Sequence, residues 1–109
     1  MAQLLELMNL RELMNLRDLR YLVAIADCLS FSRAADECAV TQSTLSIQLR
    51  KLEEYLGVVL FERDRAHVAL TAEGYEIVRH ARAAVRHADE ILVFRREQAH
   101  GGKPSGRTE

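Results

Sequence analysis

The chain has few of the residues that interrupt helices. It contains one Pro and five Gly among 109 residues, and three of those glycines lie in the last nine positions. Trp is absent and aromatic residues make up 6% of the chain, whereas apolar residues make up 49% and charged residues 28%. This composition favours a globular, mainly helical protein over a disordered one. A chain of this length supports one small domain plus an accessory helix.

Several other features are absent. No apolar run of about eighteen residues occurs, so no membrane span is expected, and no basic-then-apolar start predicts a secretory signal. Cys28 and Cys38 form no CxxC pair and fit small core thiols in a reducing cytoplasm. His80 and His87 lie among arginines and lack a third ligand, which indicates a solvated face. We therefore expect no enzyme, no metal site and no cofactor.

The charge balance gives no support to nucleic-acid binding by itself. The formal net charge is −1, and residues 31–65 carry five basic against six acidic side chains. Many DNA-binding domains are basic because they neutralise phosphates. A case for DNA must therefore depend on where the charges lie.

What is present is a succession of short helical patterns with turn signals between them. Apolar residues recur at helical spacing from Leu16 to Leu29, and 32–38 forms a second short helix capped by Ser30 or Ser32. Thr41 caps a third helix over 42–56, which ends at Gly57. Residues 58–61 and 68–70 suit two short strands, and Thr71 caps a last helix that continues to about residue 98, although Gly74 leaves the capping box incomplete.

The second and third helices have the pattern of a helix-turn-helix. Small residues (Ala34, Ala35, Cys38) precede the turn, and a leucine stripe from Leu45 to Leu56 forms the inner face of the third helix. The opposite face of its first turns is polar, as in a recognition helix that enters the major groove. A helix start rich in Ser, Thr and Gln is also typical of a capped, solvated surface. Arg63 and Arg65 lie between the two predicted strands, where a wing would reach the DNA backbone, but they could instead pair with Glu62 and Asp64 as ordinary surface charge.

The residues Phe31–Ala35 (FSRAA), Val40–Ser46 (VTQSTLS) and Gln48–Glu53 (QLRKLE) resemble the LysR-type transcriptional regulators. The resemblance runs in one collinear order from about residue 14 to 94, and the opening MNLRDLRYLVAIAD is most similar to the peroxide-responsive branch. It implies a mainly α fold: a winged helix-turn-helix with a short two-stranded wing, followed by a long linker helix that dimerises. Two departures are Ile47, where the family often has a polar residue, and Asp64, where a neutral or basic residue is common.

Pattern and resemblance together predict a set of DNA-contacting side chains. They are Ser32, Arg33, Thr41, Gln42, Ser43, Thr44, Ser46, Ile47, Arg50, Arg63, Arg65 and His67. The partner is double-stranded DNA with an interrupted inverted repeat, and the implied role is transcriptional regulation in the cytoplasm, at the nucleoid.

The last helix carries an apolar stripe at heptad-like spacing, which predicts a homodimer seam. Its members are Ile77, Val78, Ala81, Ala84, Val85, Ala88, Ile91 and Leu92. The start of this helix, near 75–81, is also expected to pack on its own domain. The resembling family has a ligand-sensing domain after the linker helix, whereas this chain stops at Glu109; a higher oligomer is expected only with such a domain.

The expected organisation has four parts: an N-terminal extension (1–13), the winged helix-turn-helix (14–71, with the helix-turn-helix at 31–50 and the wing at 58–70), the linker helix (72–98) and a disordered tail (99–109). Residues 8–13 and 14–19 form a tandem repeat of unknown role. Two alternatives stay open. In the first, the chain is a truncated partner module that heterodimerises with a full-length relative. In the second, Cys28 and Cys38 form a redox switch.

Overall fold

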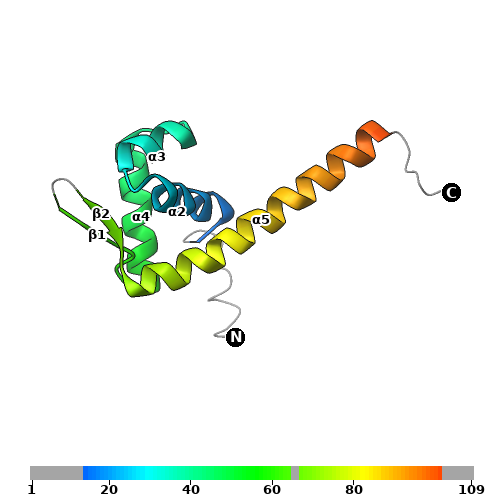
Figure 1. Ribbon diagram of the computed structural model, residues 1–109. Coiled ribbons are helices and arrows are strands. Elements are labelled where there is room, and N and C mark those ends of the chain that lie inside the picture. Colours follow the sequence, from blue (N-terminus) through cyan, green and yellow to red (C-terminus); the bar gives the residue numbers. More distant parts are fainter. Residues whose placement is uncertain (1–13, 65–66, 102–109) are drawn as a thin grey trace.

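The computed structural model describes residues 14–64 and 67–101, with side chains up to residue 99. Along the chain it has α2 (Leu16–Cys28), α3 (Phe31–Cys38), α4 (Gln42–Leu56), β1 (Phe61–Arg63), β2 (Val68–Leu70) and α5 (Ala72–Gly101). Three short helices form a compact head, the two strands extend from one side of it, and α5 projects far beyond it (Figure 1). The predicted fold, a mainly helical winged helix-turn-helix with a long last helix, is confirmed. The expected N-terminal extension, residues 65–66 and most of the expected tail lie outside the described residues.

Each helix of the head begins at a polar cap. The side chains of Asn15, Ser30 and Thr41 accept hydrogen bonds from the backbone N–H three residues later, at 2.9, 3.2 and 3.0 Å respectively. These bonds satisfy N–H groups that have no partner within the helix. Of the two predicted caps for α3, the structure has Ser30. The predicted bounds of α4 and its cap Thr41 are confirmed.

Each of these helices ends on a residue in the left-handed conformation. Gly57 has φ 74°, as its position after α4 predicted, but Leu29 (φ 49°) and Ala39 (φ 59°) adopt the same conformation without being glycine. At Ala39 the N–H bonds back to Asp36 and the next N–H, of Val40, bonds to Ala35. This is how the chain makes the tight turn between α3 and α4.

The core lies where the three helices meet the base of the wing and the start of α5. Its fully buried side chains include Leu22 and Ile25 of α2, Leu45 and Leu52 of α4, and Leu60 before β1. Ala34 and Ala35 of α3 are also buried, so small side chains stand where α3 approaches its neighbours. The predicted leucine face of α4 therefore points inward, and its polar face is left to solvent.

The wing is an antiparallel pair in which Phe61 pairs with Leu70 and Arg63 with Val68. The prediction of a first strand over 58–61 was wrong in its position, because pairing starts only at Phe61. The preceding backbone is bound elsewhere: the carboxylate of Glu53 accepts from the N–H of Leu60 (2.8 Å), and the Thr71 hydroxyl donates to the carbonyl of Val59 (2.6 Å). These tertiary bonds override the β propensity of the valines.

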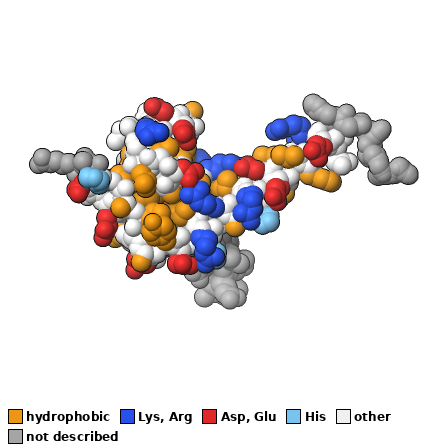
Figure 2. All heavy atoms as spheres, in the orientation of Figure 1, with side chains coloured by type: hydrophobic (Ala, Val, Ile, Leu, Met, Phe, Trp, Pro, Cys, Tyr) orange, Lys and Arg blue, Asp and Glu red, His pale blue; other side chains and the backbone are white. Residues whose placement is uncertain are grey.

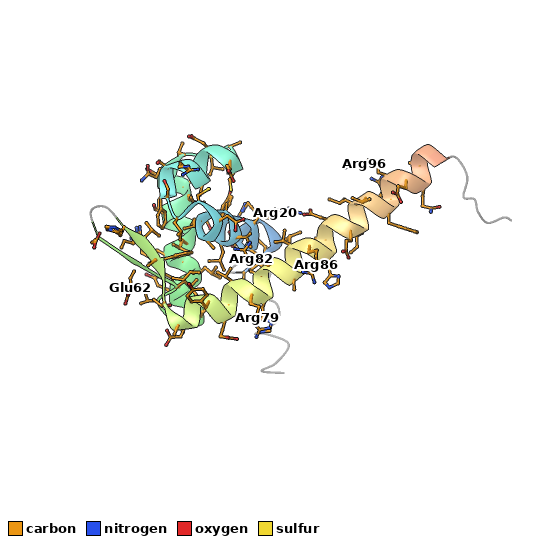
Figure 3. All side chains as sticks on the ribbon, viewed as in Figure 1. Arg20, Glu62, Arg79, Arg82, Arg86 and Arg96 are labelled. Atoms are coloured by element: carbon orange, nitrogen blue, oxygen red, sulfur yellow. The ribbon has the colours of Figure 1, made fainter. Side chains whose placement is uncertain are left out.

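Helix α5 packs on α2 at its start and then leaves the head. Two ion pairs tie the helices together, Arg82 to Asp27 (2.6 Å) and Arg20 to Asp89 (2.7 Å). Arg20 and Arg82 lie where α2 runs beside α5 (Figure 3). The helix continues through Gly101 and not only to about 98, because no Pro or Gly interrupts it earlier than Gly101 after its first turn. None of the described helices has the length and apolar character that crossing a membrane requires.

Candidate nucleic-acid interface

The exposed face of α4 gathers most of the predicted DNA-contacting side chains. Leu45, Leu49 and Leu52 are at most 2% exposed on the inner face of the helix. On the outer face, a hollow of about 450 Å³ is lined by Gln42, Ser43, Ser46, Ile47 and Arg50. All of these are exposed except the half-buried Ser46, and Ile47 is 44% exposed. The first turns of α4 thus present amide, hydroxyl, guanidinium and methyl groups on one surface.

The two threonines at the start of α4 bond to each other. The Thr41 hydroxyl accepts from the backbone N–H of Thr44 and donates to the Thr44 hydroxyl at 2.9 Å. Their hydroxyls therefore fix the start of the helix. A helix start carries partial positive charge on its free N–H groups, which favours an anion such as a phosphate.

A second hollow joins α3, α4 and the wing. It measures about 350 Å³, and the polar side chains in its lining include Ser32, Gln42, Arg63 and His67. Gln42 borders both hollows, so the outer face of α4 and the inner side of the wing form one continuous surface. We call the residues lining the two hollows the α4–wing face. Arg33 is exposed but borders neither hollow, and Arg65 lies outside the described residues.

The wing arginine Arg63 is held against an aromatic ring. Its guanidinium carbon lies 4.2 Å from the centroid of the Phe31 ring, within the range of a cation–π contact. Phe31 packs edge-on against Phe61, with 6.3 Å between ring centroids and an interplanar angle of 76°. No local pattern predicts this contact, because α3 and β1 lie far apart along the chain.

Asp64, which departs from the resembling family, closes the turn of the wing. Its Oδ1 accepts from the backbone N–H of His67 at 3.0 Å, and its own N–H donates to the carbonyl of His67 at 3.0 Å. The His67 ring lies 3.5 Å from the same carboxylate. The carboxylate therefore has a structural role at the tip, although its charge still opposes a phosphate there.

Two further positions that the sequence did not single out as functional hold the wing to the head. Glu53 of α4 bonds to the backbone just before β1. Gly74 lies against the backbone of Leu60, where a Cβ atom would overlap the Leu60 carbonyl oxygen. This close approach explains why the first turn of α5 has Gly where a capping box would have Glu. Thr71 nevertheless caps α5 as predicted, since its hydroxyl accepts from the N–H of Gly74 at 2.9 Å.

The predicted dimer stripe of α5 divides into two parts. Val78 and Ala81 are 3% exposed in the core of their own domain, with the half-buried Ile77 packed against it, so they are unavailable to a partner. Val85 and Ala88 are half-buried, and Ala84 is exposed. Farther out, Ile91 and Leu92 are 67% and 50% exposed. The packing of the first part follows from its position beside α2.

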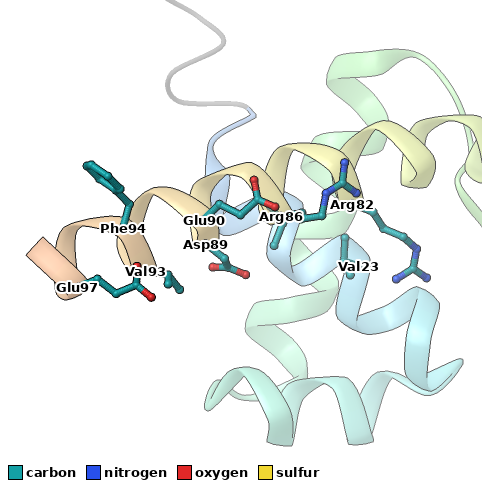
Figure 4. A pocket seen from close by; sticks show the side chains of 9 residues that line it. Val23, Arg82, Arg86, Asp89, Glu90, Val93, Phe94 and Glu97 are labelled. Carbon is teal, nitrogen blue, oxygen red and sulfur yellow. The ribbon is translucent and has the colours of Figure 1, made fainter. Parts of the chain in front are cut away.

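Beyond Ala88 the helix has an apolar surface with little to cover it. Val93 and Phe94, which the stripe omitted, are also exposed, at 47% and 62%. Apolar side chains follow the projecting part of α5 in the space-filling view (Figure 2). A hollow of about 560 Å³ lies between Val23 of α2 and α5, with Val85, Asp89 and Val93 in its lining. Phe94 projects from a different side of the helix than Val93 (Figure 4).

In the part of the chain that the structure describes, the thiols and histidines form no second site. Cys28 and Cys38 are half-buried free thiols, and burial raises the pKa of each above its ordinary value, with Glu37 adding to the shift. A raised pKa disfavours the reactive thiolate. Within 14–64 and 67–101, no group of three or more His, Cys, Asp or Glu side chains is arranged to hold a metal ion. His80 and His87 are exposed on α5.

Comparison with known proteins gives relatives for this arrangement. The hydrogen peroxide-inducible genes activator of Haemophilus influenzae is 44% identical over 83 residues, which cover 76% of this chain and 27% of that protein. The DNA-binding transcriptional dual regulator OxyR of Escherichia coli K12 is 47% identical over 83 residues, 76% of this chain and 26% of its own. The chain thus spans about a quarter of the length of the curated relatives it matches.

Solved structures agree with the fold. The BenM DNA-binding domain in complex with benA site 1 DNA superposes with a TM-score of 0.73 at 36% identity, over 86% of this chain and 100% of that one. A full-length OxyR variant from Pseudomonas aeruginosa gives a TM-score of 0.71 at 44% identity, over 83% of this chain and 29% of that one. The sequence model of bacterial regulatory helix-turn-helix proteins of the lysR family matches residues 16–75. The chain therefore belongs to the lysR family of bacterial regulatory helix-turn-helix proteins.

Proposed function

We propose that the chain binds double-stranded DNA through the α4–wing face and regulates transcription. The observation that carries the proposal is the polar outer face of α4, from Gln42 to Arg50, next to the wing arginine Arg63 across the shared border at Gln42. A helix of this width fits the major groove, where Gln and Arg pair with adenine and guanine edges. Membership of a regulatory family and likeness to domains solved with DNA support the same role.

The individual contacts are part of this proposal. Gln42, Ser43, Ser46 and Arg50 read base edges, and Ile47 lies against a thymine methyl group. Ser32, Arg63 and His67 meet the phosphate backbone, and the two cap threonines hold the helix start beside it. Arg33 and Arg65 add positive charge toward the phosphate backbone. The chain has a net charge of −1, but Arg50 and Arg63, which line the two hollows, place positive charge on this surface.

We further propose a homodimer formed through the outer part of α5. The exposed Ile91 and Leu92 continue the helical stripe of Ala84, Val85 and Ala88, and this apolar surface is one that a second copy of the helix would cover. A two-fold dimer presents two copies of α4 to an interrupted inverted repeat. Such a regulator acts in the cytoplasm, at the nucleoid. Since the relatives carry the names of transcriptional regulators, we keep the prediction that this chain is not an enzyme.

The test is a fluorescence-anisotropy titration of the full chain at two salt concentrations. One duplex carries an AT-rich interrupted inverted repeat and the other a scrambled sequence. We expect tighter binding to the repeat and a loss of that preference in Gln42→Ala, about 1–3 kcal/mol for one base contact. Arg63→Ala should lower affinity for both duplexes and reduce the salt slope by about 0.9.

The matched control is Arg79→Ala. Arg79 is an exposed arginine of α5 that pairs with Glu76 at 2.8 Å, and Figure 3 places it away from the wing. It should leave affinity and salt slope unchanged. A folded dimer that binds neither duplex at low salt contradicts the proposal and fits the alternative of a partner module.

A further inference from the structure

In the free chain, the side chain of the wing residue Arg63 is oriented by a contact with an aromatic ring. Arg63 is exposed, yet its guanidinium lies over the ring of Phe31, which is 7% exposed at the start of α3. An aromatic ring attracts a cation over its face. No carboxylate forms an ion pair with Arg63 anywhere in 14–64 or 67–101, so the ring is the group that orients it.

The ring itself is held in place from the wing. Phe61 and Arg63 lie two positions apart on β1, so both side chains are on the same face of the strand. That face is turned toward Phe31, whose ring is inclined at 76° to the Phe61 ring and lies under the Arg63 guanidinium carbon, 4.2 Å from the ring centroid. Two residues of one strand, Phe61 and Arg63, thus contact Phe31. The contact joins α3 to the wing.

The N–H donors of the Arg63 guanidinium are available to a ligand. Within 14–64 and 67–101 none of them takes part in a hydrogen bond or ion pair, and a guanidinium carries five such donors. Arg63 also borders the hollow that Ser32, Gln42 and His67 line, at the junction of wing and α4. The stack therefore presents a planar donor on the surface where a phosphate of bound DNA would lie.

We propose that Phe31 is a positioning residue for duplex binding, which acts by holding the Arg63 guanidinium in its phosphate-binding orientation. This inference rests on the proposed function. A prepositioned side chain loses less freedom when it binds than one that is free to rotate. The contact also makes the distance between wing and α4 less variable, because α3 leads directly into α4 through the turn at Ala39. Phe31 itself need not touch the DNA.

The stack can be tested without DNA, by nuclear magnetic resonance of the arginine side chains. In the free wild-type chain the Arg63 Nε–Hε signal should be displaced upfield by the ring current of Phe31. Phe31→Leu should abolish the displacement. Phe61→Leu, the matched control, removes the neighbouring ring but should keep most of the displacement, because a leucine at position 61 still packs against Phe31 and the ring over which Arg63 lies is retained. An undisplaced wild-type signal overturns the proposal, whether or not the chain binds DNA.

The consequence for binding is tested by a double-mutant cycle on the duplex with the inverted repeat. Phe31→Leu should weaken binding about two- to fivefold, as expected for one exposed cation–π contact. In an Arg63→Ala background it should have no further effect, and Phe31→Tyr should bind like wild type. Equal weakening in both backgrounds overturns the proposal, because the ring would then act on folding alone.

Arg63→Lys covers the case in which Phe31→Leu does not fold. It keeps the charge at an exposed position but replaces the planar group by a compact ammonium. We expect affinity below wild type and above Arg63→Ala, and a lysine variant equal to wild type overturns the proposal. If the wild type binds no duplex at all, the proposed function fails, and the side-chain spectrum still decides whether Arg63 is held.

Discussion

The Oε2 atom of Glu53 accepts a hydrogen bond from the backbone N–H of Leu60, with 2.8 Å between the heavy atoms. The same segment is held from α5, since the Thr71 N–H donates to the Leu60 carbonyl at 3.0 Å. One buried residue of the chain thus has its donor bound by α4 and its acceptor bound at the start of α5. The position of the wing relative to the recognition helix depends on these bonds.

We expect Glu53→Ala to lower the free energy of unfolding by about 1–3 kcal/mol, because the Leu60 N–H would lose its partner. Urea denaturation followed by circular dichroism measures this. The control is Glu54→Ala, at an exposed neighbouring position, which should stay within about 0.5 kcal/mol of wild type. Equal effects of the two substitutions would mean that the Glu53 bond contributes nothing specific.

For Gly74→Ala, helix propensity and packing predict opposite changes in stability. Helix propensity alone predicts that alanine stabilises a helical position by about 1 kcal/mol. The structure predicts the opposite, because the added Cβ would overlap the Leu60 carbonyl and force the wing base away from α5. We expect a loss of about 1–3 kcal/mol, read as a lower Tm and urea midpoint.

Gly57→Ala separates this effect from backbone strain. Gly57 has φ 74°, and nothing lies within 4 Å of a Cβ placed there, so alanine would meet only the left-handed penalty of about 1–2 kcal/mol. Gly57→Ala should leave duplex affinity unchanged in the folded protein. Gly74→Ala should also weaken binding, because it moves the wing. If Gly74→Ala stabilised the protein, the close contact between residue 74 and the Leu60 carbonyl would be contradicted.

Local signals were enough to predict some elements and not others. The bounds of α4 follow from Thr41 and Gly57, whose effects on the backbone act within one turn. The first strand was misplaced because residues 59 and 60 are bound by Glu53 and Thr71, which belong to other elements and lie seven and twelve residues away from their partners. Composition and periodicity contain no information about such pairs.

The candidate site shows the same division. The side chains around Gln42 on α4 could be grouped from helical spacing, because one helix places them. The contact between Arg63 and Phe31 joins two elements and could not be predicted from spacing. Helical spacing groups the apolar residues of α5 into a stripe, but spacing does not tell which turns face α2. Only the structure separates Val78, which is core, from Ile91, which is exposed.

We expect the thiols of Cys28 and Cys38 to react slowly with alkylating reagents in the folded chain. Burial raises the pKa of Cys28 and Cys38 above the ordinary value of 9.0. At pH 7.5 both should react with iodoacetamide far more slowly in the folded chain than in urea, as intact-mass measurement would show. Fast labelling of the folded chain would instead favour the redox-switch alternative.

The same shifts set the direction of the pH dependence of stability. A folded-state pKa above the unfolded value means that the folded chain holds its protons more tightly. The stabilising effect is then complete below about pH 9 and is lost as the pH rises through the folded-state values. Removing the thiols in a Cys28→Ala, Cys38→Ala chain should reduce the loss of stability as the pH rises above about 9. If the double variant lost as much stability above pH 9 as the wild type, the thiols would not be the cause of the alkaline loss.

The outer part of α5 should decide the oligomeric state. Ile91 and Leu92 are 67% and 50% exposed in the single chain, and burying one such side chain contributes about 1.5–3 kcal/mol. In a two-fold dimer each substitution acts twice, so Leu92→Glu should raise the dissociation constant of the dimer at least a hundredfold, measured by analytical ultracentrifugation. Its helix content and unfolding midpoint at low concentration should be those of the wild-type monomer. His80→Gln, at an exposed position near the base of the helix, should leave the dimer intact.

A wild-type chain that sediments as a monomer at high concentration would contradict the proposal that α5 forms the dimer interface. The head would then bind half-sites independently, and affinity for the repeat would not depend on half-site spacing.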